Sequence, residues 1–156
     1  MAYLTFALRL LIGGVLVVAG ALKAHDGPVV TATFVAGYRI LPASVVAPLG
    51  VALPYAEIVL GAYLVAGLFT RAAAWVATAQ FALFAVAVGS LVVRNIPADC
   101  GCFGASVPTT PSWGHVAADL ALAGVTAVIA WRAPGALAVD RVLAPSGGFP
   151  AQRENE

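Results

Sequence analysis

The sequence predicts an all-α integral membrane protein, a bundle of four transmembrane helices with a short interfacial helix between the first two spans. The first observation is composition, since 62% of the residues are hydrophobic and 10% are charged, with a mean hydropathy of +0.97. Soluble domains carry roughly a quarter of their residues as charged side chains, so lipid must cover much of this surface. The second is length, because four apolar runs each reach the ~20 residues that cross a bilayer core. The third is pattern: the runs are continuous and rich in Ala, Leu and Val, which predicts helices rather than barrel strands.

The four predicted spans are connected by short segments. They cover residues 3–22, 45–69, 72–93 and 113–131. The first run could be read as a signal peptide ending at Ala19-Gly20-Ala21. However, no positive charge precedes it and Arg9 interrupts it, so we expect it to be retained as a span.

The segment 25–42 carries the predicted interfacial helix. It opens on a turn signal, Asp26-Gly27-Pro28. Phe34 and Tyr38 then follow at helical spacing, which suits a short helix at headgroup level. Re-entrant packing against the bundle is the alternative that the sequence leaves open.

The chain has room for one domain, which we place at residues 1–133, with a disordered tail at 134–156. A net charge of +1 provides no basic surface for nucleic acid. An even number of spans puts both termini on one side of the membrane, and the Lys/Arg bias decides which. The terminal side would carry Arg9, Arg71, Arg132 and Arg141, and the other side Lys23, Arg39 and Arg94. We therefore expect a multi-pass cell-membrane protein with cytoplasmic termini and an extracytoplasmic segment between the third and fourth spans.

Both cysteines of the chain, Cys100 and Cys102, lie in that segment with a single glycine between them. A disulfide needs the two α-carbons within ~7 Å, and Gly101 supplies the bend that this requires. Such a small ring is a poor stabiliser, whereas strained or exposed disulfides tend to be the exchangeable ones. The alternatives are inert packing and metal capture by the two thiolates with His115.

Four polar residues fall within or near the predicted spans, where an ionisable group suggests function by default. They are Arg9, Glu57, Gln80 and Asp119. We expect Arg9 to pair with Glu57 between the first two spans, and Gln80 to form an interhelical hydrogen bond. His115 and Asp119 share a helical face just after the cysteines, so they could support the formation of a thiolate.

Several blocks of sequence together resemble a known family. The first, Arg9-Leu10-Leu11-Ile12-Gly13, is similar to the first helix of DoxX-like membrane proteins. The others resemble the methylamine utilisation MauE family: Tyr38-Arg39-Ile40-Leu41-Pro42, Leu53-Pro54-Tyr55-Ala56-Glu57 and Asp99-Cys100-Gly101-Cys102-Phe103-Gly104. The similarity covers residues 4–131, and the cysteine block is its most specific part.

The resemblance implies a four-helix membrane protein that takes part in extracytoplasmic thiol–disulfide redox with a thioredoxin-like partner. It implies a role in maturing secreted or periplasmic proteins, as in methylamine dehydrogenase biogenesis. Cys100 and Cys102 would be the redox pair of a possible thiol–disulfide oxidoreductase. The alternatives are a non-enzymatic scaffold for a maturation factor and, more weakly, a metal-handling protein.

One redox pair cannot by itself move electrons through a membrane. The electrons must therefore pass to or from another protein, or to a quinone bound within the bundle, for which the sequence suggests the surroundings of Arg9 and Glu57. No other cofactor is expected.

Overall fold

The computed structural model describes residues 2–133 and 137–140, and within these ranges the secondary structure is helical. The helices are α1 (Ala2–Asp26), α2 (Pro28–Gly37), α3 (Ala43–Ala66), α4 (Thr70–Val93) and α5 (Trp113–Arg132). Four of them, α1, α3, α4 and α5, are long and apolar enough to cross a membrane. The shorter apolar helix α2 lies between the first two, so the predicted architecture is confirmed.

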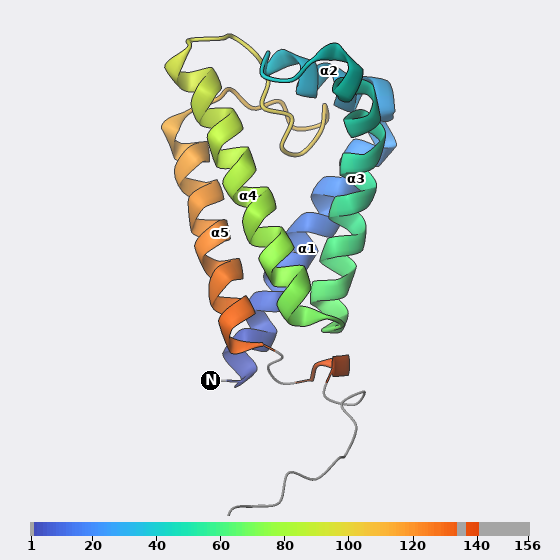
Figure 1. Ribbon diagram of the computed structural model, residues 1–156, viewed down its shortest axis with the longest axis vertical. Coiled ribbons are helices and arrows are strands. Elements are labelled where there is room, and N and C mark those ends of the chain that lie inside the picture. The colour runs from blue at the N-terminus through green and yellow to red at the C-terminus, as the bar shows by residue number, and fades with distance from the viewer. Residues whose placement is uncertain (1, 134–136, 141–156) are drawn as a thin grey trace, which may run out of the picture.

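The long helices are arranged as two close pairs (Figure 1). α1 packs along α3 and α4 packs along α5, whereas α3 and α4 contact each other much less. α3 and α4 are joined by the turn at 67–69 and diverge from there. The open end between them carries α2 and the loop that contains the cysteines, and the N-terminus lies at the opposite end of the bundle.

Glycines let α1 and α3 approach until their backbones touch. A Cβ atom added to Gly13 would lie 2.7 Å from the carbonyl oxygen of Gly61, and one added to Gly61 would lie 2.6 Å from that of Gly13. Close backbone approach at small residues is a general way of joining helices in lipid. Because this contact fixes α1 relative to α3, the polar side chains of α1 lie opposite defined residues of α3.

Arg9 is fully buried, but it binds the end of α3 and not Glu57. Its Nε donates to the carbonyl oxygen of Leu64 at 2.9 Å, and Nη2 donates to that of Val65 at 3.3 Å. The last carbonyls of a helix have no partner within the helix, so a cation there is favourable. The predicted Arg9–Glu57 pair is wrong, because Glu57 is bound by Lys23, about four turns or ~21 Å further along α1.

Residues 137–140 return to the turn between α3 and α4. Asp140 accepts hydrogen bonds from the backbone N–H groups of Phe69 and Thr70, at 2.7 and 2.8 Å. Asp140 therefore caps the start of α4, because the N-cap residue Phe69 has no side-chain acceptor for these N–H groups. The remainder of the predicted tail, residues 134–136 and 141–156, lies outside the described residues.

Candidate functional site

The loop between α4 and α5, residues 94–112 and here called the cysteine loop, is fastened to α2 and to the end of α1. The hydroxyl of Tyr38, at the end of α2, donates to the carbonyl oxygen of Cys100. The N–H of Ala105 donates to Asp26 Oδ2 at 2.6 Å. These contacts join positions far apart in sequence, so the cysteines sit at a defined place over the open end of the bundle.

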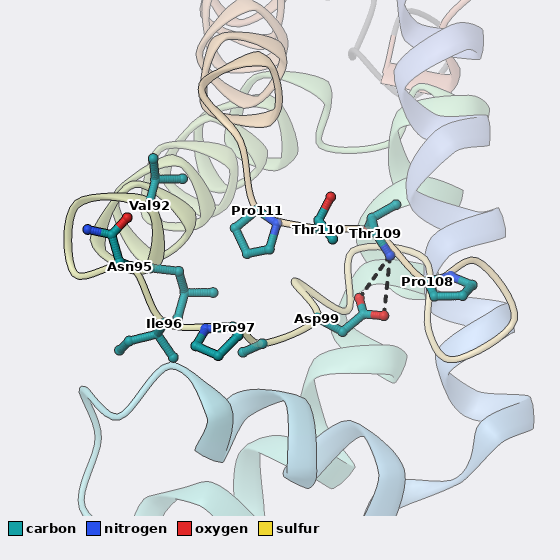
Figure 2. A pocket seen from close by; sticks show the side chains of 11 residues that line it. Val92, Asn95, Ile96, Pro97, Asp99, Pro108, Thr109, Thr110 and Pro111 are labelled. Carbon is teal, nitrogen blue, oxygen red and sulfur yellow. Dashed lines mark hydrogen bonds between the residues drawn. The ribbon is translucent and has the colours of Figure 1, made fainter.

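Asp99 holds the two arms of the cysteine loop together. Its carboxylate accepts the N–H of Gly101 at 3.0 Å and the N–H of Thr109 at 3.2 Å on each oxygen. Figure 2 shows the Asp99 carboxylate and Thr109 facing each other beside a cavity of about 500 Å³ between this loop and the end of α4. The N–H of Cys100 in turn donates to the carbonyl oxygen of Thr109 at 3.2 Å. The cysteine turn is therefore held by backbone and carboxylate hydrogen bonds on both sides.

The two thiols are in contact. Cys102 Sγ lies 3.1 Å from Cys100 Sγ and donates a hydrogen bond to it. Gly101 between them has a φ of 62°, a conformation that side chains rarely adopt. Cys100 is only 3% exposed, while Cys102 is half-buried. The S–S bond of a disulfide is ~2.05 Å long, so the sulfurs would need to move only about 1 Å closer when an oxidant removes their two electrons.

The surroundings of Cys100 favour its thiolate. The hydrogen bond from the Cys102 thiol lowers the pKa of Cys100 most strongly, burial opposes this, and the Thr109 hydroxyl at 2.7 Å lowers it further, to about 5. The same shared hydrogen bond raises the pKa of Cys102, and burial raises it further. A pair in which one sulfur ionises readily and the other keeps its proton is suited to stepwise thiol chemistry.

His115 and Asp119 lie near the thiols but act in opposite directions. The charge of His115 lowers the pKa of Cys100, whereas that of Asp119 raises the pKa of Cys102. His115 is half-buried, with Nδ1 2.9 Å from the hydroxyl of Ser112. Asp119 is buried, and its Oδ2 has no hydrogen-bond partner within the described residues. The fifth helix therefore brings both residues into the electrostatic surroundings of the thiol pair.

A buried ionic cluster lies close to the cysteines. Lys23 Nζ lies 2.7 and 2.8 Å from the two carboxylate oxygens of Glu57, and Gln80 Nε2 donates to Glu57 Oε1 at 3.3 Å. Gln80 thus makes the interhelical hydrogen bond expected from the sequence. Lys23, expected in a loop, is instead a buried residue of α1. Its position follows from α1 continuing to Asp26, one turn beyond the predicted end.

A second cavity, of about 450 Å³, links this cluster to the thiols. Its lining comes mostly from α2, α3 and α4, to which α1 adds Lys23 and the cysteine loop adds Cys100 and Cys102. Arg9 does not line it. Arg9 and Glu57 lie at different levels of the bundle, and this cavity reaches Lys23 and Gln80, the partners of Glu57, but not Arg9.

The comparison with known proteins matches the part of the chain that contains the five helices and the cysteine loop. A sequence model of the family described as methylamine utilisation protein MauE matches residues 1–132. The chain belongs to the MauE family. The matched region ends with α5 and contains the cysteine loop, α2 and the Lys23–Glu57 pair. The search of curated proteins and the search of solved structures each found no match.

Three residues of this MauE protein position the thiols but were not singled out by sequence reasoning. They are Tyr38, Asp99 and Thr109. Tyr38 and Asp99 lie inside two of the blocks that resemble the family, and this resemblance could have identified them as site residues. Nothing in the sequence pointed to Thr109, because a single threonine in a Ser/Thr/Pro-rich loop has no distinctive pattern.

Within the described residues, no group of three or more His, Cys, Asp or Glu side chains is placed to hold a metal ion, so the metal-handling alternative finds no support.

Proposed function

We propose that this MauE family membrane protein exchanges disulfides with a thioredoxin-like partner on the extracytoplasmic side of the cell membrane. Cys100 and Cys102 would be the redox pair. The observation that carries the proposal is the contact between the two sulfurs, 3.1 Å apart in a turn held by Asp99 and Tyr38. A pair of buried, inert cysteines would not need such a dedicated arrangement of hydrogen bonds.

The difference between the two sulfurs suggests which one meets the partner. Cys102 is the more exposed residue, and Cys100 is the better leaving group because its pKa lies well below the ordinary thiol value. In the oxidised protein, a partner thiolate would attack Cys102 Sγ, and the S–S bond would break with its electron pair on Cys100. The second thiol of the partner would then attack the mixed disulfide and release Cys102. In the reverse direction the same mixed disulfide forms, again on Cys102.

The family gives this chemistry a context. MauE proteins are described as methylamine utilisation proteins, and the cysteine loop suits a role in the maturation of secreted or periplasmic proteins, as in methylamine dehydrogenase biogenesis. We infer that the bundle anchors the reaction at the membrane while the substrate is a soluble protein outside. His115 would support the Cys100 thiolate, and the charge of Asp119 would disfavour a second thiolate on Cys102 while Cys100 is ionised.

Trapping of a mixed disulfide tests the proposal. Cys100→Ser leaves Cys102 without its resolving partner, so we expect it to accumulate a mixed disulfide with a thioredoxin-like protein in intact cells. Cys102→Ser should trap much less, because Cys100 is buried. The adduct is detected by non-reducing electrophoresis and mass spectrometry. The proposal fails if neither variant forms an adduct and both support the maturation of secreted disulfide proteins as the wild type does.

A non-enzymatic scaffold for a maturation factor is the second candidate, favoured by the 3% exposure of Cys100. It predicts cysteines that react with neither oxidant nor reductant. Thiol labelling after each treatment separates the two candidates, since a redox pair changes its labelling and a scaffold does not.

A further inference from the structure

The cavity of about 450 Å³ beside the thiols has the form of a small-molecule site. Its volume falls within the range of ~300–1,000 Å³ that is usual for ligand pockets. Most of its lining is apolar, and its few polar groups gather near the thiol pair. It lies where α3 and α4 diverge, beneath α2 and the cysteine loop, and so at the end of the bundle opposite the N-terminus (Figure 1).

Part of the lining of this cavity is exposed at the surface of the bundle. Leu83 and Val86 of α4 line it and are 68% and 70% exposed. Ile40, just before α3, also lines it and is 51% exposed. Apolar side chains that are exposed along a membrane span face acyl chains, so a lipid-soluble molecule could enter between α3 and α4 without crossing water.

The inner end of the cavity offers hydrogen-bond donors. Glu57 takes two of the three N–H groups of Lys23, and Gln80 uses one amide N–H for Glu57. Among the described residues, one amide N–H of Gln80 has no partner, and the third N–H of Lys23 has only the ring of Phe84, whose centroid lies 5.5 Å from Nζ. These two N–H groups suit a carbonyl oxygen, and a negative charge that develops on such an oxygen would be stabilised by the nearby cation.

We propose that this cavity binds a membrane quinone, which accepts the electrons of the Cys100–Cys102 dithiol. The quinone ring would lie against the thiols with one carbonyl oxygen towards Lys23 and Gln80, and its isoprenoid tail would leave between α3 and α4. The inference rests on the proposed function, because it supplies the acceptor that a single redox pair lacks. The sequence suggested a quinone near Arg9 and Glu57. The cavity instead places it beside the cluster of Lys23, Glu57 and Gln80.

The step is balanced without a further reactant. The S–H bonds of Cys100 and Cys102 break and one S–S bond forms, which releases two electrons and two protons. The quinone takes up both electrons and both protons, and its two carbonyl groups become the hydroxyls of a quinol. Cys100, which lines the cavity and ionises first, is expected to add its thiolate to a ring carbon of the quinone. Cys102 Sγ then attacks Cys100 Sγ, and the C–S bond breaks with its electron pair on the ring, which leaves as the quinol. The charge of Asp119 acts on Cys102, and its buried Oδ2 has no hydrogen-bond partner among the described residues, so Asp119 is placed to take the proton that this thiol releases.

Single-turnover reduction of a benzoquinone tests the site. The reduced full-length protein in lipid nanodiscs is mixed with ubiquinone-1, and quinone absorbance and free thiols are followed together. We expect one quinol formed and two thiols lost for each protein molecule. Cys100→Ser should abolish both changes.

A cavity-filling variant separates this site from quinone reduction elsewhere. Ala79 of α4 lines the cavity, so Ala79→Phe should raise the quinone concentration for half-maximal rate by about tenfold or more. Ala72→Phe, on the exposed surface of the same helix and away from the cavity, should leave it unchanged. Equal rates for Ala79→Phe and the wild type would overturn the placement in this cavity.

A second measurement distinguishes failure of the quinone site from failure of the thiol chemistry. The oxidised protein is offered reduced thioredoxin as a dithiol probe. Exchange with thioredoxin but no reduction of ubiquinone-1 would overturn this inference and leave the proposed function standing. If neither reaction occurs, the proposed function fails with it.

Discussion

Thr109 places its hydroxyl oxygen 2.7 Å from Cys100 Sγ, where it can donate a hydrogen bond to the thiolate. Hydrogen bonds to charged groups contribute about 1.5–3 kcal/mol, which corresponds to about one pH unit or more in a pKa. Thr109→Val should therefore raise the pKa of Cys100 from about 5 by about one pH unit. The rate of alkylation by iodoacetamide, measured against pH on the reduced protein, reports this value, because only the thiolate reacts.

The neighbouring threonine provides the control for this prediction. Thr110 is exposed and makes no hydrogen bond to either sulfur among the described residues, so Thr110→Val should leave the alkylation profile unchanged. An unchanged profile for Thr109→Val would show that the Thr109 hydroxyl does not support the Cys100 thiolate.

Residue by residue, the sequence predicted that the two cysteines meet, but it did not predict the side chains that hold them. The Cys-Gly-Cys unit identified the pair, and the need for a bend identified Gly101, which has the positive φ that a bend requires. The hydrogen bond from Tyr38 to Cys100 spans 62 positions of sequence. No periodicity reports a contact of this kind, because it depends on how α2 packs against the rest of the bundle.

At the scale of helices, the buried pair of Lys23 and Glu57 joins α1 to α3. Removing one partner of a buried ion pair costs about 3–5 kcal/mol, whereas replacing both with apolar residues is often close to neutral. Lys23→Met and Glu57→Leu should each lower the thermal unfolding midpoint in detergent, and the double variant should recover most of the loss. A double variant that loses the sum of the two single effects would show that the residues are not coupled.

The Lys23–Glu57 pair shows which features of the helices could not be predicted from the sequence. Apolar length placed all four spans within a few residues of their observed bounds, because crossing lipid needs a fixed number of apolar residues. It did not place Lys23, since a cation after an apolar run usually marks the end of a span. It also paired Glu57 with Arg9, because the choice between two cations on α1 depends on the register at which Gly13 and Gly61 lock α1 against α3.

For the whole molecule, the cysteine loop lies at one end of the bundle, and the N-terminus and the turn between α3 and α4 lie at the other. Burial changes the charge count that orients the bundle, because Arg9 and Lys23 are both inside it. Among the described residues, Arg71 and Arg132 remain at the end with the N-terminus, and Arg39 and Arg94 at the end with the cysteine loop. With two arginines at each end, the Lys/Arg bias no longer decides the orientation. Our proposal of cytoplasmic termini, with the thiols outside, then depends on the cysteine chemistry, because disulfides persist on the outer side.

Cysteine accessibility in intact cells tests this orientation. In a background in which Cys100 and Cys102 are both replaced by Ser, one new cysteine is introduced at an exposed position at each end of the bundle. Ala105→Cys lies in the cysteine loop, and Arg71→Cys lies at the start of α4. We expect a membrane-impermeant maleimide to label the first in intact cells and the second only after permeabilisation. The reverse pattern would put the thiols in the cytoplasm, where reduced glutathione opposes a stable disulfide, and the proposed partner would then have to be a cytoplasmic protein.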